Sequence, residues 1–527
     1  MVSSNERLAS EAGVQILQRG GNAVDAAVAV GFALAVTYPE AGNIGGGGYM
    51  VIRMADGRVA ALDYREVAPL AATRNMYVDS AGKLTDKSIV GHLASGVPGS
   101  VAGLVAAQKK FGALALRDVM APAIALAEQG FTAEGTFAAA VTNDAPLISR
   151  FGGAPLFLPN GAPVAAGARV VQPDLARTLR AVANGGADGF YRGAVADSLV
   201  AEMKRGGGII SLDDLRRYRP VWRDPIRSTY RGYTLFTMPP SSSGGITVTE
   251  TLNIMETVPR LPPFGSAAYA HLLGSAYQRA FIDRNEKLAD PAFIPVPVDR
   301  LTDKGYARAL AATIGAGRAT PTAVVENKVR ALREGNETTH YSVVDAQGNA
   351  VATTTTLNSL FGSGVWVRGG GYFLNDEMDD FAAQPGSPNQ FGLVQGEANA
   401  IQPGKRMLSA MSPTIVLDPN GDLLLVVGAR GGPRIITATS QIILNVIDHR
   451  MTLADAMSAP RIHHQALPDS LRFERRGLSQ ATMDSLTVMG YGLSPYGGIG
   501  TAHAVMRVKG GWEGFVDPRS SGAAVGY

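Results

Sequence analysis

The sequence predicts an α+β fold, because its secondary-structure signals change from helical to strand-like close to residue 337. From about residue 97 to roughly residue 314 the chain is rich in Ala and Leu and is expected to be mainly helical. After residue 338, β-branched and aromatic runs predominate and predict strands at 339–345, 350–357, 372–375, 413–417 and 423–428. The change is compatible with two domains or with one domain built from two parts of the chain.

Each of the remaining predicted elements rests on a local signal. The chain is expected to be helical to about residue 36, with Asn22 as the N-cap of a helix. The apolar run 26–36 is about half as long as a membrane span requires, so it predicts a buried helix. A Gly-rich turn and three further elements complete the prediction: the turn at 45–48, strands at 49–53 and 59–64, and a helix at 434–448.

Composition places the chain among ordinary globular proteins. Of its 527 residues, 46% are apolar and 18% are charged, and the formal net charge is +3. So small a net charge gives no reason to expect a nucleic acid or an anionic membrane as a partner. The absence of cysteine excludes disulfides, catalysis by a thiolate and zinc sites built from Cys.

One junction, NETTHYSVVDAQGNAVATTTTLNS (336–359), joins a polar segment directly to a strong strand signal. Residues 315–337 are polar and lack sustained periodicity, so they are the best candidate for a linker. The residues after the junction predict a strand, a turn at 346–349 and a returning strand. Thr fits a strand without any chemical role, so Thr338 and Thr339 taken alone are most simply structural.

The same junction also has the features of an N-terminal nucleophile. Such an enzyme needs Thr, Ser or Cys at the start of a strand, and cleavage of the preceding bond frees its α-amino group. That group has a pKa of about 7.7–8.0, which suits a general base at neutral pH. The methyl group of Thr338 restricts χ1 and so directs the hydroxyl. The N–H groups of Gly431 and Gly432, after the apolar strand 423–427, are candidate donors to an oxyanion.

Several segments carry a resemblance to a known family. They include GGNAVDAAVAVGFALAV (20–36), AGNIGGGGYM (41–50), DYREVAP (63–69), PPSSSGGI (239–246), TTHYSVVDAQGNAVA (338–352), LNDEMDDF (374–381), KRMLSAMSPTIV (405–416) and GARGGPRIIT (428–437). Over essentially its whole length the sequence resembles the γ-glutamyltranspeptidase family of the N-terminal nucleophile hydrolase superfamily. The segments follow one another in the family's order.

The resemblance implies a self-cleaving precursor with a four-layer αββα sandwich. Cleavage between Glu337 and Thr338 would make Thr338 the new N-terminus. Residues 1–337, ending in a cleavable linker at about 315–337, would become a helix-rich large subunit. Residues 338–527 would become a strand-rich small subunit, and the two fragments would jointly form the fold as a heterodimer. The linker is expected to be exposed and mobile, because it has to be cut.

The resemblance also implies a set of substrate-binding residues. Arg65 matches the arginine that clamps the glutamyl α-carboxylate, a task suited to a planar guanidinium that donates two parallel hydrogen bonds. Glu377 and Asp380 match residues that hold the α-ammonium. Ser409 matches one of two adjacent serines that bind the α-carboxylate. The alternatives are a surface ion pair for Arg65 and a solvated acidic turn for the two acids.

Further roles concern the nucleophile and the lid over the site. Thr356 matches a residue that supports the nucleophile, and Asn358 matches an amide that contacts the substrate; both could otherwise be plain strand residues. The segment 385–396 matches the family's lid loop, with Phe391 where a Tyr is common. Ala410 stands where the family has its second serine, which removes one hydrogen bond to the α-carboxylate.

The expected activity is that of a γ-glutamyl transferase/hydrolase on γ-glutamyl amides such as glutathione, through a γ-glutamyl ester of Thr338. Water or an amino acid would then accept the acyl group, and neither a metal nor an organic cofactor is implied. His463 and His464 lack a third ligand at metal spacing and are interpreted as structural. The alternatives are a cephalosporin (glutaryl) acylase, a poly-γ-glutamate depolymerase, or a binding protein that never matures.

The family also implies a location outside the cytoplasm. The N-terminal segment MVSSNERLASEAG has no apolar signal-peptide core. We expect that a leader is missing from this sequence and that the native protein is periplasmic or secreted.

Overall fold

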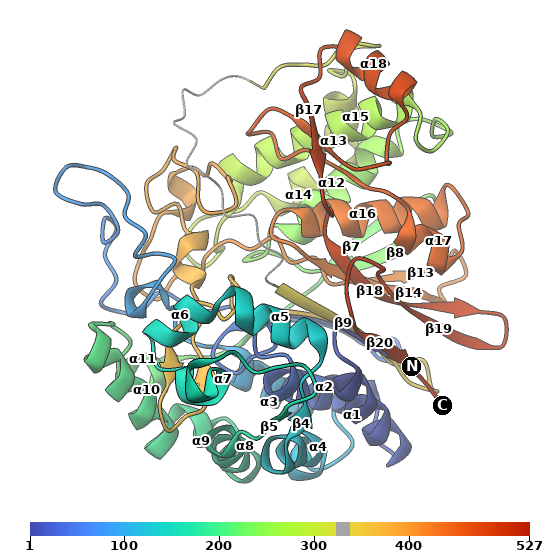
Figure 1. Cartoon of the computed structure of the whole chain (residues 1–527). Coiled ribbons are helices and arrows are strands. Elements are labelled where there is room, and N and C mark those ends of the chain that lie inside the picture. Colours follow the sequence, from blue (N-terminus) through green and yellow to red (C-terminus); the bar gives the residue numbers. More distant parts are fainter. Residues whose placement is uncertain (323–337) are drawn as a thin grey trace.

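The computed structural model describes residues 1–322 and 338–527, in which two antiparallel sheets stack face to face (Figure 1). The first sheet consists, in spatial order, of β20 (Ala523–Val525), β1 (Val2–Ser4), β9 (Thr338–Val344), β10 (Ala350–Thr356), β2 (Gly47–Arg53), β3 (Val59–Asp63) and β6 (Val221–Arg223). The second consists of β19 (Gly511–Val516), β18 (Thr501–Val508), β14 (Leu423–Arg430), β13 (Thr414–Leu417), β8 (Tyr233–Thr237) and β7 (Ile226–Tyr230).

Helices cover the outer face of each sheet, which gives the four layers that the resemblance implies. On the first sheet lie α1 (Arg7–Gln18), α2 (Ala23–Thr37) and α3 (Ser100–Phe111); α4 (Leu116–Gln129) packs on α2, and α8 (Pro173–Gly185) packs on α4. On the second lie α12 (Gly244–Met255) and α16 (Arg434–Ile447), and α13 (Ala267–Lys287) packs on α12. Strand β14 contacts β9 and β10 between the layers. The αββα prediction is therefore confirmed.

The central strands of the first sheet, β9, β10 and β2, are buried on both faces because each face meets another layer. In β2, Met50 and Ile52 join the core formed with the helices, whereas Tyr49 and Val51 join the core between the sheets. Successive side chains of a strand point to opposite faces, so this alternation follows from the pleat. Packing on both faces fixes the backbone of such a strand. Reactive side chains at the beginning or the end of the strand are then held in fixed positions.

The predicted buried helix is confirmed as α2. The Asn22 side chain accepts hydrogen bonds from the backbone N–H groups of Val24 and Asp25, and the Asp25 carboxylate accepts one in return from the Asn22 N–H. This reciprocal pair is a capping box, which satisfies backbone donors that the first turn of a helix leaves free. Every residue of α2 is buried.

Two parts of the helix prediction are wrong. Residues 2–4 form β1 rather than helix, because their pairing partners lie far along the chain, in β9 and β20. Five strands interrupt the stretch 97–314: β4 (Phe131–Thr132), β5 (Arg169–Val170), β6, β7 and β8. The β7–β8 hairpin turns at Arg231 and Gly232, whose φ angles are 51° and 86°, the left-handed values of a tight hairpin turn.

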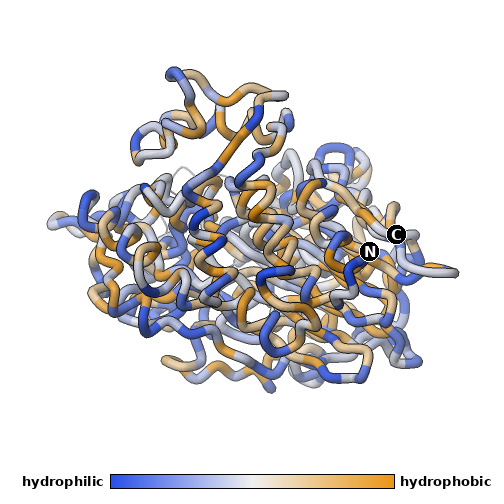
Figure 2. Tube along the Cα trace, turned by 90° about the horizontal axis from the view of Figure 1, so that it is seen from below, coloured by the Kyte–Doolittle hydropathy of each residue, from blue (hydrophilic) through white to orange (hydrophobic). Residues whose placement is uncertain are grey.

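Strands from both sides of residue 337 lie in the same sheet, so the change in sequence character divides one fold rather than two. Strands β9 and β10 lie between β1 and β2, and β1 also pairs with β20. The two ends of the chain are consequently side by side, as Figures 1 and 2 both show.

The remaining elements cover the edges of the layers. The helices are α5 (Gly135–Asn143), α6 (Ala145–Arg150), α7 (Ala154–Phe157), α9 (Asp188–Tyr191), α10 (Gly193–Gly206), α11 (Leu212–Arg217), α14 (Val298–Leu301), α15 (Lys304–Ala311), α17 (Leu453–Ser458) and α18 (Gln480–Val488). The short strands are β11 (Trp366–Val367), β12 (Tyr372–Phe373), β15 (Ile462–His463), β16 (Leu471–Glu474) and β17 (Leu493–Tyr496), and the 3₁₀ turns are η1 (His92–Ala94), η2 (Pro159–Gly161), η3 (Glu377–Asp380) and η4 (Glu397–Asn399). Within the described residues, no helix is both long and apolar enough to cross a membrane.

Candidate active site

Thr338 is the first residue of β9 and lies opposite Thr356, the last residue of β10. Its hydroxyl donates to the hydroxyl of Thr356 at 3.3 Å, and both side chains are buried. The neighbouring Thr355 hydroxyl donates to the carbonyl oxygen of Gly47 in β2 at 2.8 Å. The hydroxyl of Thr338 is therefore held at the end of the β9–β10 ladder, and β2 supports β10 on its other side.

Asn358 follows β10 in a left-handed conformation with φ of 78°, which Asn adopts more readily than most residues. Its backbone N–H donates to the Thr356 hydroxyl at 2.8 Å, and its side-chain amide donates to the carbonyl oxygen of Asp376 at 3.1 Å. The Thr356 hydroxyl thus links Thr338 to the turn that carries Asn358.

Arg65 lies at the centre of a buried group of charges. Nη1 donates to Glu377 and Nη2 donates to Asp380, while Nε donates to the carbonyl oxygen of Met407 at 3.3 Å. Glu66 lies 3.6 Å from Nη1. Arg65 is fully buried, so the alternative of a surface ion pair is wrong.

The charges of this group shift one another's pKa values. Burial acts to lower the pKa of Arg65, but Glu377, Asp380 and Glu66 raise it above its ordinary value. Burial raises the pKa of Glu377 well above its usual range and also raises that of Asp380, although Arg65 opposes both shifts. Burial raises the pKa of Glu66 to about 7, again against Arg65. One cation thus faces two buried carboxyl groups, Glu66 and Glu377, and one that is partly buried, Asp380.

Ser409 lies beside the loop that precedes α12. Its carbonyl oxygen accepts from the backbone N–H of Ser243 at 2.8 Å and from the Ser243 hydroxyl at 2.5 Å. The Ser409 hydroxyl accepts from the backbone N–H of Met411 at 3.1 Å. Ala410, between them, is buried and lines the same cavity as Thr338.

Replacing Ala410 by Ser tests this wall of the cavity. If a γ-glutamyl α-carboxylate binds here, Ala410→Ser adds a donor to it. The bond forms with the bound substrate and persists in the transition state, so it adds uniform binding. We expect KM for γ-glutamyl-p-nitroanilide to fall by up to about tenfold with kcat nearly unchanged, as steady-state kinetics would measure. An unchanged or higher KM would count against a γ-glutamyl donor while leaving the chemistry of Thr338 intact.

Gly431 and Gly432 form the turn between β14 and α16, with φ angles of 125° and 55°. Gly432 lines the cavity, and a Cβ at this position would lie 2.9 Å from the ring of Phe391. The residues that line the cavity do not include Gly431. Pro433, the N-cap of α16, has no N–H, so donors at this helix N-terminus come from the glycines.

The lid residues 389–391 are attached to acids of η3 and to a segment near residue 465. The Asn389 side chain donates to Asp380 at 3.4 Å, and the Gln390 backbone N–H donates to Asp379 at 2.9 Å. The carbonyl oxygen of Phe391 accepts from the Gln465 side chain at 3.1 Å. Phe391 therefore lies in the wall of the cavity, and its role as a lid stays a prediction.

The residues expected from the sequence converge on one small cavity. It is lined by Arg65, Arg284, Thr338, Thr356, Asn358, Glu377, Asp380, Phe391, Leu393, Ser409, Ala410, Met411, Gly432, Pro433 and Ile435. Its volume is about 20 Å³, enough for one water molecule but not for an acyl group.

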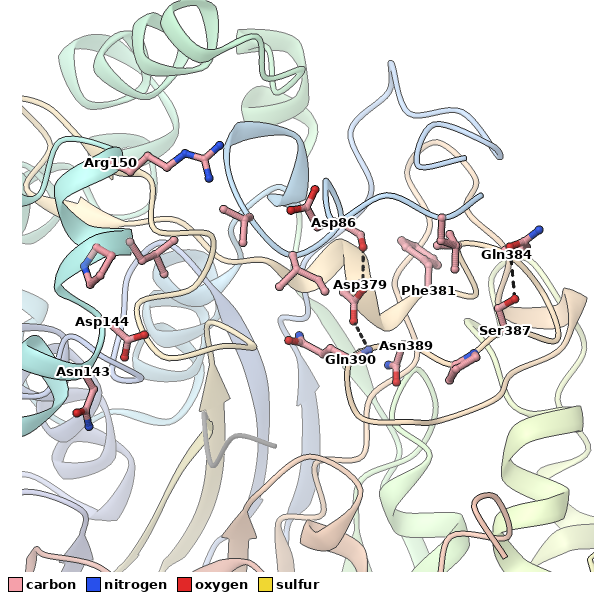
Figure 3. A pocket seen from close by; sticks show the side chains of 18 residues that line it. Asp86, Asn143, Asp144, Arg150, Asp379, Phe381, Gln384, Ser387, Asn389 and Gln390 are labelled. Atoms are coloured by element: carbon pink, nitrogen blue, oxygen red, sulfur yellow. Dashed lines mark hydrogen bonds between the residues drawn. The ribbon is translucent and has the colours of Figure 1, made fainter. Parts of the chain in front are cut away.

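A second cavity of about 580 Å³ lies on the other side of the lid and of η3. Figure 3 shows Asp379, Asn389 and Gln390 in its wall, with Asp379 accepting from Ser88 at 2.8 Å and from Gln390. Thr338 does not line this cavity. It is larger, but the smaller one holds the hydroxyl and the charges, so we place the chemistry there.

The two histidines that the sequence analysis interpreted as structural are both buried and hydrogen-bonded. His463 contacts the hydroxyl of Thr437 at 3.0 Å and Gln465 at 2.8 Å, and so supports the residue that holds the lid. His464 contacts the backbone N–H of Ala466 at 3.1 Å. Glu337 and the greater part of the linker 315–337 lie outside the described residues, so the cleavage site remains a prediction.

Sequence reasoning missed Arg284, which lines the cavity from α13. It also missed Asp376, which accepts from the backbone of Ser359 at 2.8 Å and fixes the turn beside Asn358. An arginine within a helix gives no local sign that it points into a cavity. For Asp376 the sequence did offer a signal, because it is an acid within the motif LNDEMDDF to which no role was assigned.

The sequence profile described as Gamma-glutamyltranspeptidase matches residues 9–527. The chain belongs to the γ-glutamyltranspeptidase family. This result confirms the resemblance drawn from the motifs, and it makes the chain an enzyme of the γ-glutamyltranspeptidase kind. The assignments of individual site residues are a separate matter and stay predictions.

Several known γ-glutamyltranspeptidase relatives match almost the whole chain. A protein named glutathione hydrolase proenzyme from Escherichia coli is 45% identical over 525 residues, which are 99% of this chain and 90% of the relative. A protein named acylase ACY 1 proenzyme from a Pseudomonas species is 42% identical over 474 residues, 88% of this chain and 82% of the relative. The crystal structure of a cephalosporin acylase from Bacillus halodurans superposes with a TM-score of 0.86 at 26% identity and covers 99% of this chain and 94% of that one.

Proposed function

We propose that this γ-glutamyltranspeptidase family member is a self-processing γ-glutamyl transferase/hydrolase that acts on glutathione-like γ-glutamyl amides. The observation that carries the proposal is the convergence of a strand-initial threonine, a buried arginine, the buried Glu377 and the partly buried Asp380 on one cavity. A glutamyl group carries an α-carboxylate and an α-ammonium, so it matches an arginine flanked by acids. The relatives named glutathione hydrolase proenzyme support the same substrate class.

In the mechanism, the Thr338 hydroxyl attacks the γ-carbonyl carbon of the donor. The free α-amino group of Thr338 accepts the hydroxyl proton and then delivers it to the departing amine. The N–H groups at the Gly431–Gly432 turn stabilise the oxyanion, at a helix N-terminus that favours negative charge. The resulting γ-glutamyl ester of Thr338 is then cleaved by water or by the amino group of an acceptor.

Maturation belongs to the same proposal. Cleavage between Glu337 and Thr338 would yield fragments 1–337 and 338–527, which remain together as a heterodimer. The position of Thr338 at the beginning of β9 supports this, because a chain cut there keeps every pairing of β9 and β10. We also propose that the native protein is exported to the periplasm or the medium, as the family implies.

Donor preference tests the function against its rival, a glutaryl acylase. The relatives named acylase are the reason to consider this alternative. A glutaryl group, however, lacks the α-ammonium that would pair with Glu377 and Asp380. We expect the purified protein to use γ-glutamyl-p-nitroanilide with a kcat/KM at least about tenfold above that for glutaryl-p-nitroanilide, the equivalent of about 1.4 kcal/mol. A preference for the glutaryl donor would replace the proposed function by the acylase.

A further inference from the structure

A second buried arginine shares the cavity with Thr338. Arg284, in the last turn of α13, is 1% exposed and lines the cavity together with Ser409 and Ala410. We propose that Arg284 binds the α-carboxylate of the donor and thereby supplies the contact that Ala410 cannot make. This inference rests on the proposed function and assigns a further specificity-determining residue to it.

All the hydrogen-bond partners of Arg284 are neutral. Nε donates to the hydroxyl of Ser243 at 3.2 Å, and Nη1 donates to the side-chain oxygens of Asn285 at 2.9 Å and Gln395 at 3.5 Å. In the parts of the chain that the structure describes, no carboxylate forms an ion pair with it. The positive charge of Arg284 is therefore not matched by a directly bonded anion.

Arg65 is in the opposite situation. Both of its terminal nitrogens donate to carboxylates, Nη1 to Glu377 and Nη2 to Asp380. An incoming carboxylate would have to approach a guanidinium that two acids already bind, and the negative charge of those acids opposes its approach. Arg65 alone is thus a poorly available receptor for an anion, whereas Arg284 makes no such pairs.

The energetics of burial favour an anionic partner for Arg284. Removing a guanidinium from water is costly unless a negative charge compensates it. Burial lowers the pKa of Arg284 to about 10, although Asp380 opposes the shift, so the group remains protonated at neutral pH. A carboxylate that entered the cavity would gain a charge-assisted hydrogen bond to an arginine that was already desolvated before it arrived.

Arg284 is linked through Ser243 to the part of the cavity wall where the family has its second serine, the position of Ala410 here. The Ser243 hydroxyl, which accepts from Arg284, itself donates to the carbonyl oxygen of Ser409 at 2.5 Å. Ser409 and Ala410 are consecutive and both line the cavity. An α-carboxylate near Ser409 would therefore lie between the guanidiniums of Arg65 and Arg284.

The proposal can be tested with three donor substrates that differ only in whether they carry the α-carboxylate, the α-ammonium or both. γ-Glutamyl-p-nitroanilide carries the carboxylate and the ammonium, glutaryl-p-nitroanilide only the carboxylate, and 4-aminobutyryl-p-nitroanilide only the ammonium. We expect Arg284→Gln to raise KM about 10- to 100-fold for the two donors with a carboxylate, the range for one hydrogen bond to a charged group, with kcat nearly kept. KM for 4-aminobutyryl-p-nitroanilide should stay within about twofold of wild type.

A matched control and a conservative variant separate binding from structure. Arg279 is also buried in α13, but it bonds to Thr313 and to the carbonyl oxygen of Ser275 and does not line the cavity. Arg279→Gln should therefore leave the ratio of KM values among the three donors unchanged. Arg284→Lys keeps the positive charge but loses the two parallel donors of the guanidinium. Its KM should rise for the same carboxylate donors, but by a smaller factor. This variant replaces Arg284→Gln in the test if Arg284→Gln does not fold.

The outcomes distinguish this inference from the proposed function. If wild type prefers the γ-glutamyl donor but the Arg284 variants weaken all three donors equally, Arg284 is structural and the inference is overturned. If wild type itself uses the γ-glutamyl donor no better than the others, the proposed function fails first. Ala410→Ser introduced into Arg284→Gln should recover part of the lost affinity, and should do so only for donors with a carboxylate.

Discussion

Thr338→Ala should remain a single uncut chain without measurable activity, whereas the wild type separates into two bands on a denaturing gel. The smaller wild-type band should begin Thr338-Thr339-His340 on N-terminal sequencing. The substitution removes both the hydroxyl that would attack the linker bond and the hydroxyl that would carry the acyl group. Losing a catalytic nucleophile typically costs several orders of magnitude in kcat, so this is the largest effect we expect.

The neighbouring residue provides the control. Thr339 is buried in the same strand, but successive side chains point to opposite faces of a sheet, and its hydroxyl has no hydrogen-bond partner among the described residues. Thr339→Ala should therefore mature and keep most of its activity, and Thr338→Ser should mature with reduced activity. A wild-type protein that is fully active while uncut would contradict the mechanism.

Asp380→Asn should impair γ-glutamyl donors far more than glutaryl donors. Asp380 is bonded to Arg65 and to the lid through Asn389, and only the γ-glutamyl group brings an ammonium to this position. Removing one partner of a buried charged pair costs about 3–5 kcal/mol, which corresponds to roughly two to four orders of magnitude in kcat/KM. The measurement is kcat/KM for γ-glutamyl- and glutaryl-p-nitroanilide.

The adjacent acid is a matched control for that experiment. Asp379 belongs to the same 3₁₀ turn, but it accepts from Ser88 and Gln390 and faces the larger cavity beyond the lid. Asp379→Asn can loosen the lid, and this would affect both donors equally. A similar selective loss in Asp379→Asn, or an equal loss of both donors in Asp380→Asn, would show that Asp380 does not recognise the ammonium.

The parts of the fold that the sequence predicted well depend on local signals. Strands β9 and β10 agree closely with the predictions 339–345 and 350–357, because β-branched runs flank a turn with Gly348. The helix from Asn22 onward was predictable because its cap and its apolar run are contiguous. The prediction at 434–448 was confirmed as α16, which has a contiguous apolar run but no side-chain cap.

The missed elements depend on distant partners. Strand β1 has only three residues, and it is a strand because β9 and β20 supply its hydrogen bonds. Arg284 was missed for a related reason. Its importance comes from segments near residues 243, 395 and 409, which meet only in the folded chain. The family resemblance assigned roles only to residues within the matching motifs. Arg284 lies outside those motifs, so it received no role.

The pairing of β1 with β20 places the two ends of this sequence on neighbouring strands of the sheet that also holds Thr338. Val2 lies opposite Val525, so a short peptide could join the two ends of the chain across neighbouring strands. A circular permutant joined there and opened before Thr338 would keep every strand of both sheets. In such a protein, removal of an initiator methionine would expose the amino group of Thr338 directly. We therefore expect such a permutant to be active without self-cleavage, because it would form the same two sheets around Thr338.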